Sequence, residues 1–250
     1  MLQDTHIHIQ DIKNSPAIDA FLLAAKEAGF GRMFNCAITP ADWPVVKDLS
    51  ARYEWIVPFC GFHPWFVDLA NSGWEEKLSE YLSQPGILAG EMGLDKARKN
   101  IDFDLQKDMF TGQLILARKF NKPFVVHSVR AWGETIALIR AHAPGLRFLM
   151  HSFNGNREIA LEIGKMGGYF SVPVRQFLKP DEEFKKVFAD LPLDRILIET
   201  DFPYQVKWTT PTEYVEAVRL GYATAAEWKG VSLEAFTGAV FKNGEDFVRI

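Results

Sequence analysis

Residues 123–151, PFVVHSVRAWGETIALIRAHAPGLRFLMH, contain the pattern that decides the fold class. Two short apolar runs, 123–127 and 147–151, each end in a histidine, and an amphipathic stretch at 131–141 separates them. Short β-rich runs around a longer amphipathic segment are typical of parallel strands joined by a crossover helix. This part of the sequence therefore predicts a strand–helix–strand unit with a histidine at the end of each strand.

The same alternation extends in both directions along most of the chain. The predicted strands are 2–8, 32–38, 55–61, 87–91, 123–127, 147–151, 168–172 and 195–201. The predicted helices are 17–28, 41–52, 74–83, 102–120, 131–141, 157–166, 180–188, 211–228 and 232–248. This pattern in 250 residues predicts an α/β fold of the TIM-type (β/α)8 barrel class, with the site at the carboxyl ends of the strands. Because no linker, internal repeat or low-complexity tract marks a boundary, we expect one domain over residues 1–250.

The composition narrows the class of protein. The chain has no apolar run near the ~20 residues that span a bilayer, so we expect a soluble, cytoplasmic protein without a membrane segment. Cys36 and Cys60 each lie in an apolar run, and we expect buried free thiols. The net charge of −4 disfavours a module that binds nucleic acid through its own basic residues. It does not disfavour a nuclease, because bound metal ions supply local positive charge. No obligate protein partner is indicated.

Histidines and carboxylates gather at the predicted strand ends. The candidate metal ligands are His6, His8, Glu91, His127, His151 and Asp201. His6 and His8 are two residues apart, so the alternation of a strand points both to one side. With Glu91 as a bridging carboxylate, this set predicts two divalent metal ions. The first site would be completed by His6, His8 and Asp201, and the second by His127 and His151. Imidazole suits Zn, Ni, Fe or Mn, and carboxylates suit Mg or Mn, so the set does not identify its metal.

Each of these residues also has an ordinary structural explanation. A single histidine at a strand end is more often a hydrogen-bonded residue than a ligand. Glu91 and Asp201, taken alone, are equally typical of helix caps or of partners for a nearby Lys or Arg. Six ligand-type residues at the ends of five strands belong to one face of one barrel, however, which favours a metal centre. His142, at the end of a predicted helix beside Pro144, is given no function.

Six ordered motifs resemble those of the TatD family of metal-dependent hydrolases, within the amidohydrolase superfamily, and they extend over the whole chain. They are DTHIH at 4–8, GFHPW at 61–65, GEMGLD at 90–95, VVHS at 125–128, HSFNG at 151–155 and ETDFP at 199–203. The resemblance implies the same ligands, with Glu91 shared between the two metals. It also implies that His63 lies near the substrate phosphate and outside the metal ligands. The alternative is a histidine that only fixes the turn before Pro64.

The chain departs from the family in two loops. After GLD the family usually carries an aromatic residue and an arginine, whereas KARKNIDFDLQKDMF follows here at 96–110. After ETDFP it usually carries a short basic segment that contains Asn, whereas YQVKWTTP follows here at 204–211. These departures affect the expected substrate specificity and not the metal site.

The resemblance implies a deoxyribonuclease that cleaves phosphodiester bonds at strand ends, as a 3′–5′ exonuclease. The candidate catalytic residues are Asp201, Glu91 and His63. Two metals ~4 Å apart activate a bridging water as the nucleophile. Asp201 would orient this water and exchange a proton with the nucleophile or the leaving group.

In addition to His63, candidate substrate contacts lie in the strand-to-helix loops. Three tryptophans are placed to stack an unpaired base: Trp65, Trp132 and Trp208. Three cations are placed to contact phosphates: Arg130, Arg175 and Lys207. Tryptophans that only pack over the barrel mouth are the alternative. Two other functions stay open, namely hydrolysis of a small amide, lactone or phosphoester on the same barrel, and metal binding without catalysis.

Overall fold

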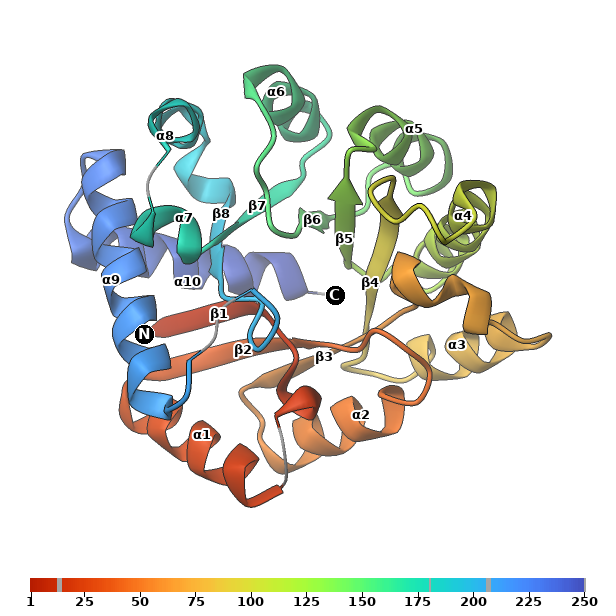
Figure 1. Ribbon diagram of the computed structural model, residues 1–250, viewed down its shortest axis with the longest axis horizontal. Helices are drawn as coiled ribbons and strands as arrows, with labels where there is room; N and C mark the ends of the chain where they lie inside the picture. Colours follow the sequence, from red (N-terminus) through yellow and green to blue (C-terminus); the bar gives the residue numbers. More distant parts are fainter. Residues whose placement is uncertain (13–14, 180, 206–207, 250) are drawn as a thin grey trace.

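Eight parallel strands form one sheet that curls into a barrel (Figure 1). The computed structural model describes residues 1–12, 15–179, 181–205 and 208–249. The strands are β1 (Leu2–Ile7), β2 (Phe30–Cys36), β3 (Ile56–Cys60), β4 (Leu88–Asp95), β5 (Phe124–Val129), β6 (Phe148–Met150), β7 (Tyr169–Pro173) and β8 (Ile196–Glu199). They pair in chain order, each parallel to the next. The predicted barrel of the TIM type is therefore confirmed.

Hydrogen bonds join the first and last strands at their carboxyl ends. The backbone N–H of Asp201 donates to the carbonyl oxygen of His6 at 2.9 Å, and the N–H of His8 donates to the carbonyl oxygen of Phe202 at 2.9 Å. Ile7 and Phe202 form a parallel bridge between these two bonds. Segments from opposite ends of the sequence are thus held side by side at the end of the barrel where such folds place their active sites.

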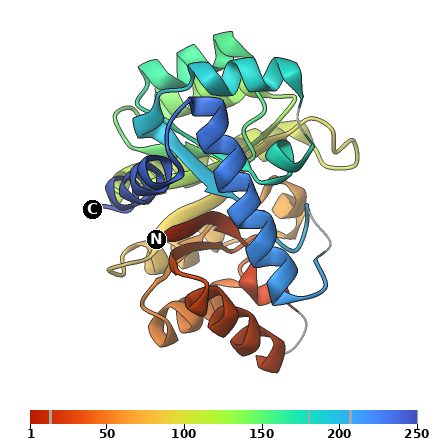
Figure 2. The same ribbon diagram turned by 90° about the vertical axis from the view of Figure 1, so that its left-hand side faces the viewer.

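Helices connect the strands and surround the barrel (Figures 1 and 2). The α-helices are α1 (Ser15–Glu27), α2 (Trp43–Arg52), α3 (Trp74–Leu82), α4 (Phe103–Lys119), α5 (Trp132–His142), α6 (Arg157–Lys165), α7 (Arg175–Leu178), α8 (Glu182–Asp190), α9 (Pro211–Lys229) and α10 (Leu233–Val248). The 3-10 helices are η1 (Ile9–Asp11), η2 (Pro64–Leu69) and η3 (Leu193–Arg195). Local sequence sets where they begin. At α9, for example, Thr210 and Glu213 form a capping box and Pro211 occupies the first turn.

The helix α10 covers the amino end of the barrel. Its Phe247 packs against Phe34 of β2, Phe59 of β3 and Tyr169 of β7, with ring centroids 5.9, 6.3 and 5.3 Å away. Figure 2 shows α10 beside the amino terminus. The strands β4, β6, β7 and β8 are buried along their whole length, as parallel strands covered on both faces are. The carboxyl end of the barrel is the end left for a site.

Two expectations from composition can be compared with the structure. Cys36 and Cys60 are both buried and free, as predicted. Within the described parts of the chain, no helix combines the length and the apolar character needed to cross a membrane.

The structure differs from the predicted elements mainly at their ends. β4 continues to Asp95, so Glu91 lies within the strand and not at its end as predicted. The helix predicted at 180–188 is observed as α8, and the short helix α7 precedes it. The 3-10 helices were not predicted, because one or two tight turns are too short to show a periodic pattern.

Candidate metal centre

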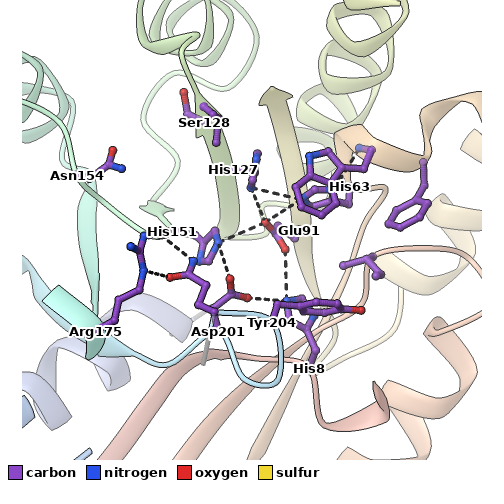
Figure 3. Close-up of a pocket in the computed structure, with 16 residues that line it drawn as sticks. His8, His63, Glu91, His127, Ser128, His151, Asn154, Arg175, Asp201 and Tyr204 are labelled. Carbon is purple, nitrogen blue, oxygen red and sulfur yellow. Dashed lines mark hydrogen bonds and ion pairs between the residues drawn. The ribbon is translucent and has the colours of Figure 1, made fainter. Parts of the chain in front are cut away.

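Six ligand-type side chains meet at the carboxyl end of the barrel, and Figure 3 shows all of them except His6. His6 lies in β1 and His8 directly after it, Glu91 lies in β4, and His127 lies in β5. The other two follow their strands directly, with His151 after β6 and Asp201 after β8. All six are buried. The structure therefore brings together every residue that the sequence predicted as a metal ligand.

One group of these side chains surrounds His6 and His8. Their Nε2 atoms lie 3.2 Å apart, which places both rings on the same side as the period of a strand requires. Asp201 Oδ1 lies 3.1 Å from His8 Nε2 and 3.8 Å from His6 Nε2. Glu91 Oε2 lies 3.1 Å from His6 Nε2 and 3.8 Å from His8 Nε2. Two imidazole nitrogens and two carboxylate oxygens thus converge on one small volume.

A second group surrounds the other oxygen of Glu91. Oε1 lies 3.1 Å from His127 Nδ1 and 3.7 Å from His151 Nε2. His63 Nε2 lies 3.4 Å from the same oxygen. The two oxygens of Glu91 therefore face two different sets of nitrogen atoms, which is the geometry of a bridging carboxylate.

The position of Glu91 inside β4 depends on a close approach between β4 and β5. Gly93 has φ of 149°, and a β-carbon at this position would overlap the carbonyl oxygen of His127. Only glycine fits there. The pairing of β4 with β5 also shifts register between Ala89 and Met92, around Glu91. These features place the Glu91 carboxylate beside His127 although the strand continues beyond it.

The outward nitrogens of three histidines each face an oxygen acceptor. His8 Nδ1 donates to the carbonyl oxygen of Cys36 at 2.7 Å. His151 Nδ1 lies 2.9 Å from Glu199 Oε1, and His127 Nε2 lies 3.4 Å from Asp95 Oδ2. A proton held on the outward nitrogen leaves the lone pair of the inward nitrogen free, which is the usual arrangement of metal-binding histidines. The residues present therefore fit divalent metal ions.

The charges of the buried groups depend on one another. Burial alone would raise the pKa of Glu91, but electrostatic interactions with His63, His6 and His151 and a hydrogen bond from His127 hold it well below its usual range. Burial alone would lower the pKa of His8, but the hydrogen bond and charge of Asp201 raise it to about 9. In the metal-free centre, protons on His8 and His127 thus balance part of the carboxylate charge. A divalent cation would replace these protons as the positive partner of the carboxylates.

His63 differs from the other histidines in its hydrogen bonding. Its Nδ1 accepts the backbone N–H of Trp65 at 3.2 Å, so the proton of the neutral ring lies on Nε2. Nε2 faces Glu91 and lies 3.3 Å from His127 Nδ1. Burial lowers the pKa of His63 to about 4, so the ring is neutral at pH 7. His63 therefore directs an N–H donor toward the second group of ligands.

A pocket of about 460 Å³ opens above these side chains. Its volume is that of a typical small-molecule site. One part of its wall is apolar or aromatic and consists of Ile38, Trp65, Phe66 and Val129. Another part is polar and consists of Ser152, Asn154, Arg175, Tyr204 and Gln205. His8, His63, Glu91, His127, Ser128, His151 and Asp201 also line the pocket.

Three of the predicted substrate contacts line this pocket, namely His63, Trp65 and Arg175. Arg130 does not, because the chain turns away from β5 there with a left-handed φ of 55°. Trp132 packs edge-on against Phe153, and its ring centroid lies 5.6 Å away.

Trp208 does not line the pocket either. It stacks on Phe202 with ring centroids 5.8 Å apart, so this tryptophan and Trp132 have the packing role that was the alternative. Lys207 lies outside the described residues.

Two carboxylates were missed by the sequence reasoning, although both lie in motifs that it identified. Glu199 is buried against His151, and its Oε1 also accepts the backbone N–H of Ser152 at 2.8 Å. Asp95 is buried against His127 and accepts the indole N–H of Trp65 at 2.6 Å. Each lies at or near a strand end, in ETD and in GLD. The signal was therefore present in the sequence, because Glu199 lies two residues before Asp201 and Asp95 lies four residues after Glu91, and such even spacings place strand side chains on one side.

The fold and the buried ligand set define a barrel hydrolase that depends on bound metal. Residues 3–249 match the family model described as TatD related DNase, and the chain belongs to this family. It is 27% identical over 259 residues to the uncharacterized metal-dependent hydrolase YabD of Bacillus subtilis, covering all of both chains. It is 27% identical over 251 residues to the deoxyribonuclease TATDN3 of Homo sapiens, covering 93% of this chain and 89% of that protein.

The fold is shared with a solved structure. The crystal structure of YjjV, a TatD homolog from Escherichia coli, superimposes with a TM-score of 0.89 at 24% identity. The alignment covers 100% of this chain and 98% of YjjV. This similarity supports the barrel architecture.

Proposed function

We propose that the protein is a deoxyribonuclease that hydrolyses phosphodiester bonds from a DNA strand end, in the 3′ to 5′ direction. The observation that carries the proposal is the placement of Glu91, which directs one oxygen toward His6 and the other toward His127. This is the arrangement expected of a carboxylate that bridges two divalent ions. Its neighbours His8 and Asp201 would hold the first ion.

The second ion would be held by Glu91, His127 and His151. Ions bound in both positions would lower the pKa of a bound water and polarise a phosphoryl oxygen. The chain itself supplies the orientation of the ligands, because Cys36 and Glu199 face the outward nitrogens of His8 and His151. These contacts keep the inward lone pairs aimed at the ions before any substrate arrives.

Two side chains are placed to move or share protons. Burial alone would raise the pKa of Asp201, but the charge of His151 and the hydrogen bond and charge of His8 lower it to about 2. Asp201 is therefore ionised at neutral pH and lines the pocket, so it is placed to accept the proton of the attacking water. The neutral His63 directs Nε2–H into the same pocket and is placed to donate to an oxygen of the phosphate.

The substrate class is supported by the pocket and by the relatives. The deoxyribonuclease name of TATDN3 suggests DNA. Trp65 offers an aromatic wall for a base, and Arg175 offers a guanidinium for a phosphate on the opposite side. A pocket of about 460 Å³ is suited to a terminal residue of a strand, which favours attack at an end.

The test is cleavage of single-stranded DNA by the metal-loaded protein, with the Glu91→Ala variant as the matched control. The DNA is labelled at the 5′ end in one sample and at the 3′ end in another, and a circular single strand serves as the substrate without ends. We expect a ladder that shortens from the 3′ end, no cleavage of the circle and no activity of the variant. Cleavage of the circle would contradict attack at an end.

The same preparations are assayed on a panel of small amides, lactones and phosphoesters. Turnover of a small substrate by the wild-type protein alone, with DNA intact, would replace the proposed substrate and retain the metal-dependent chemistry. An absence of turnover on every substrate with metal bound would favour a barrel that binds metal without catalysis.

A further inference from the structure

The loop between β4 and α4 extends from the carboxyl end of the barrel (Figure 2). Asp95, the last residue of β4, fixes the start of this loop. Its Oδ1 accepts the backbone N–H of Ala97 at 2.8 Å, and its backbone N–H donates to Gln106 Oε1 at 2.8 Å. Its Oδ2 accepts the indole N–H of Trp65 at 2.6 Å. The Asp95 carboxylate therefore fixes the start of the loop relative to the side chain of Trp65, which lines the pocket.

The guanidinium of Arg98, a residue of this loop, lies over the ring of Trp65. The guanidinium carbon is 3.6 Å from the centroid of the Trp65 ring, the closest contact between a cation and a ring among the described residues. Arg98 is exposed, and it forms no ion pair with any carboxylate in the part of the chain that the structure describes. Stacking on a ring uses the face of the guanidinium and leaves its N–H edges free. Arg98 is thus a positioned cation with unused donors.

The position of Arg98 relative to the metal centre follows from Trp65. The Trp65 ring lies 6.1 Å from the ring of His127 and 4.9 Å from that of His63. Arg98 is therefore one indole ring removed from the ligands. In Figure 3, His63 and Arg175 lie on opposite sides of Glu91. Since Arg98 stacks on the tryptophan beside His63, the two arginines flank the centre on opposite sides.

We propose that Arg98, held on Trp65, binds a phosphate of the DNA chain next to the phosphate that is cleaved. The inference rests on the proposed nuclease function. It adds that the preferred substrate has at least two phosphates, one that is cleaved at the metal centre and one that binds Arg98 at the mouth of the pocket. A guanidinium fork matches a phosphate and forms charge-assisted hydrogen bonds with it. Because the stack and the Asp95 anchor fix the guanidinium in advance, little side-chain entropy is lost on binding. The alternative is that Arg98 only covers the ring of Trp65.

The test compares steady-state kinetics on two substrates that differ in flanking phosphates. Bis(p-nitrophenyl) phosphate has one phosphate and no flanking group, whereas a five-residue oligothymidylate has several. For Arg98→Ala we expect KM on the oligothymidylate to rise about tenfold with kcat unchanged, since a hydrogen-bonded charge contact is lost. Its KM on bis(p-nitrophenyl) phosphate should stay within about twofold. The slope of log KM against log salt on the oligothymidylate should decrease by about one.

Two further variants separate charge from packing. Arg98→Gln keeps a planar group that can cover Trp65 but removes the charge, so it should behave like Arg98→Ala. Arg118→Ala removes an exposed arginine from the last turn of α4 and should match the wild-type protein. A wild-type KM for Arg98→Gln on the oligothymidylate would mean that Arg98 only covers the ring, which overturns the inference.

The outcomes also distinguish this inference from the proposed function. If the wild-type protein cleaves the oligothymidylate and Arg98→Ala cleaves it with the same KM, only the phosphate contact is wrong. An equal loss on both substrates would assign Arg98 a structural role and overturn the contact as well. If the wild-type protein hydrolyses bis(p-nitrophenyl) phosphate but no oligonucleotide, the nuclease function fails and the Arg98 contact fails with it.

Discussion

Replacing Glu199 by Gln should weaken metal binding in a way that depends on pH. Glu199 is fully buried, and its Oε1 lies 2.9 Å from His151 Nδ1 and accepts the Ser152 N–H at 2.8 Å. Gln has nearly the same shape and keeps an oxygen acceptor, so the fold should persist. What the substitution removes is the negative charge that faces the outward nitrogen of a metal ligand.

The magnitude follows from the change in hydrogen-bond type. A hydrogen bond to a charged group contributes about 1.5–3 kcal/mol and a neutral one about 0.5–1.5 kcal/mol, so the difference is about 1–1.5 kcal/mol. This corresponds to about 5- to 13-fold weaker binding at the site that contains His151. Burial raises the pKa of Glu199 to about 8 in the metal-free protein. Below that pH the wild-type group is largely a neutral acid and resembles Gln, so the deficit should be small near pH 6.5 and full near pH 9.

Competition between the protein and a chromophoric chelator for Zn²⁺ measures this affinity directly. Circular dichroism and the urea midpoint establish that the variant is folded. Glu234→Gln, which changes an exposed glutamate in the first turn of α10, serves as the matched control and should bind zinc like the wild-type protein. Equal affinities of Glu199→Gln and wild type at pH 9 would refute the argument, and so would a deficit that does not change with pH.

Four other results are expected. Asp201→Asn should keep the fold and lose about 10³-fold or more in kcat, because the proton acceptor is lost; substantial residual turnover in a stopped assay would contradict this. His63→Ala should lose about 10²-fold in kcat with little change in zinc affinity, because the His63 ring donates a hydrogen bond to the substrate and does not bind the metal. A large loss of zinc affinity in the chelator competition would instead show that His63 is a metal ligand. In the metal-free protein the carboxylates outweigh burial and raise the pKa values of His8 and His127 to about 9. Metal binding should therefore release protons, and calorimetry should find a metal affinity that rises from pH 7 to 9 and is constant above pH 9. Because the raised pKa values stabilise the folded state only while these histidines are protonated, the free energy of unfolding of the metal-free protein should decrease from pH 6.5 to 9. Gly93→Ala should lower the free energy of unfolding by about 3 kcal/mol or more because the β-carbon overlaps the His127 carbonyl; an unchanged urea midpoint would disprove this.

The inner ligands were predictable because a periodic rule governs them. His6 and His8 obey the alternation of a strand, and His127 and His151 end short apolar runs of the length typical of buried strands. Glu91 was predicted as a ligand but assigned to a strand end. The sequence pattern did not reveal that β4 continues to Asp95, because the apolar run stops at the glycines that allow the close approach to β5.

The pocket wall was harder to predict because loops form it. Trp65, Trp132 and Trp208 all lie in or next to strand-to-helix loops, yet only Trp65 lines the pocket. The direction of a side chain in a loop depends on its tertiary contacts. Trp132 packs on Phe153 and Trp208 on Phe202, and no local periodicity announces either contact. The polar side of the wall, including Asn154, depends on similar loop geometry.

The closure of the barrel between β1 and β8 sets the order in which the protein can mature during synthesis. Asp201, the partner of His8, is synthesised 193 residues after it. At ~5–20 residues per second, the interval is about 10–40 s, during which the histidines of the nascent chain have no complete site to enter. The ligand set can therefore be completed only after Asp201 has been synthesised. A message that stops before the codon for Asp201 yields a polypeptide that lacks this ligand and the hydrogen bond from Asp201 to His6 at the barrel seam.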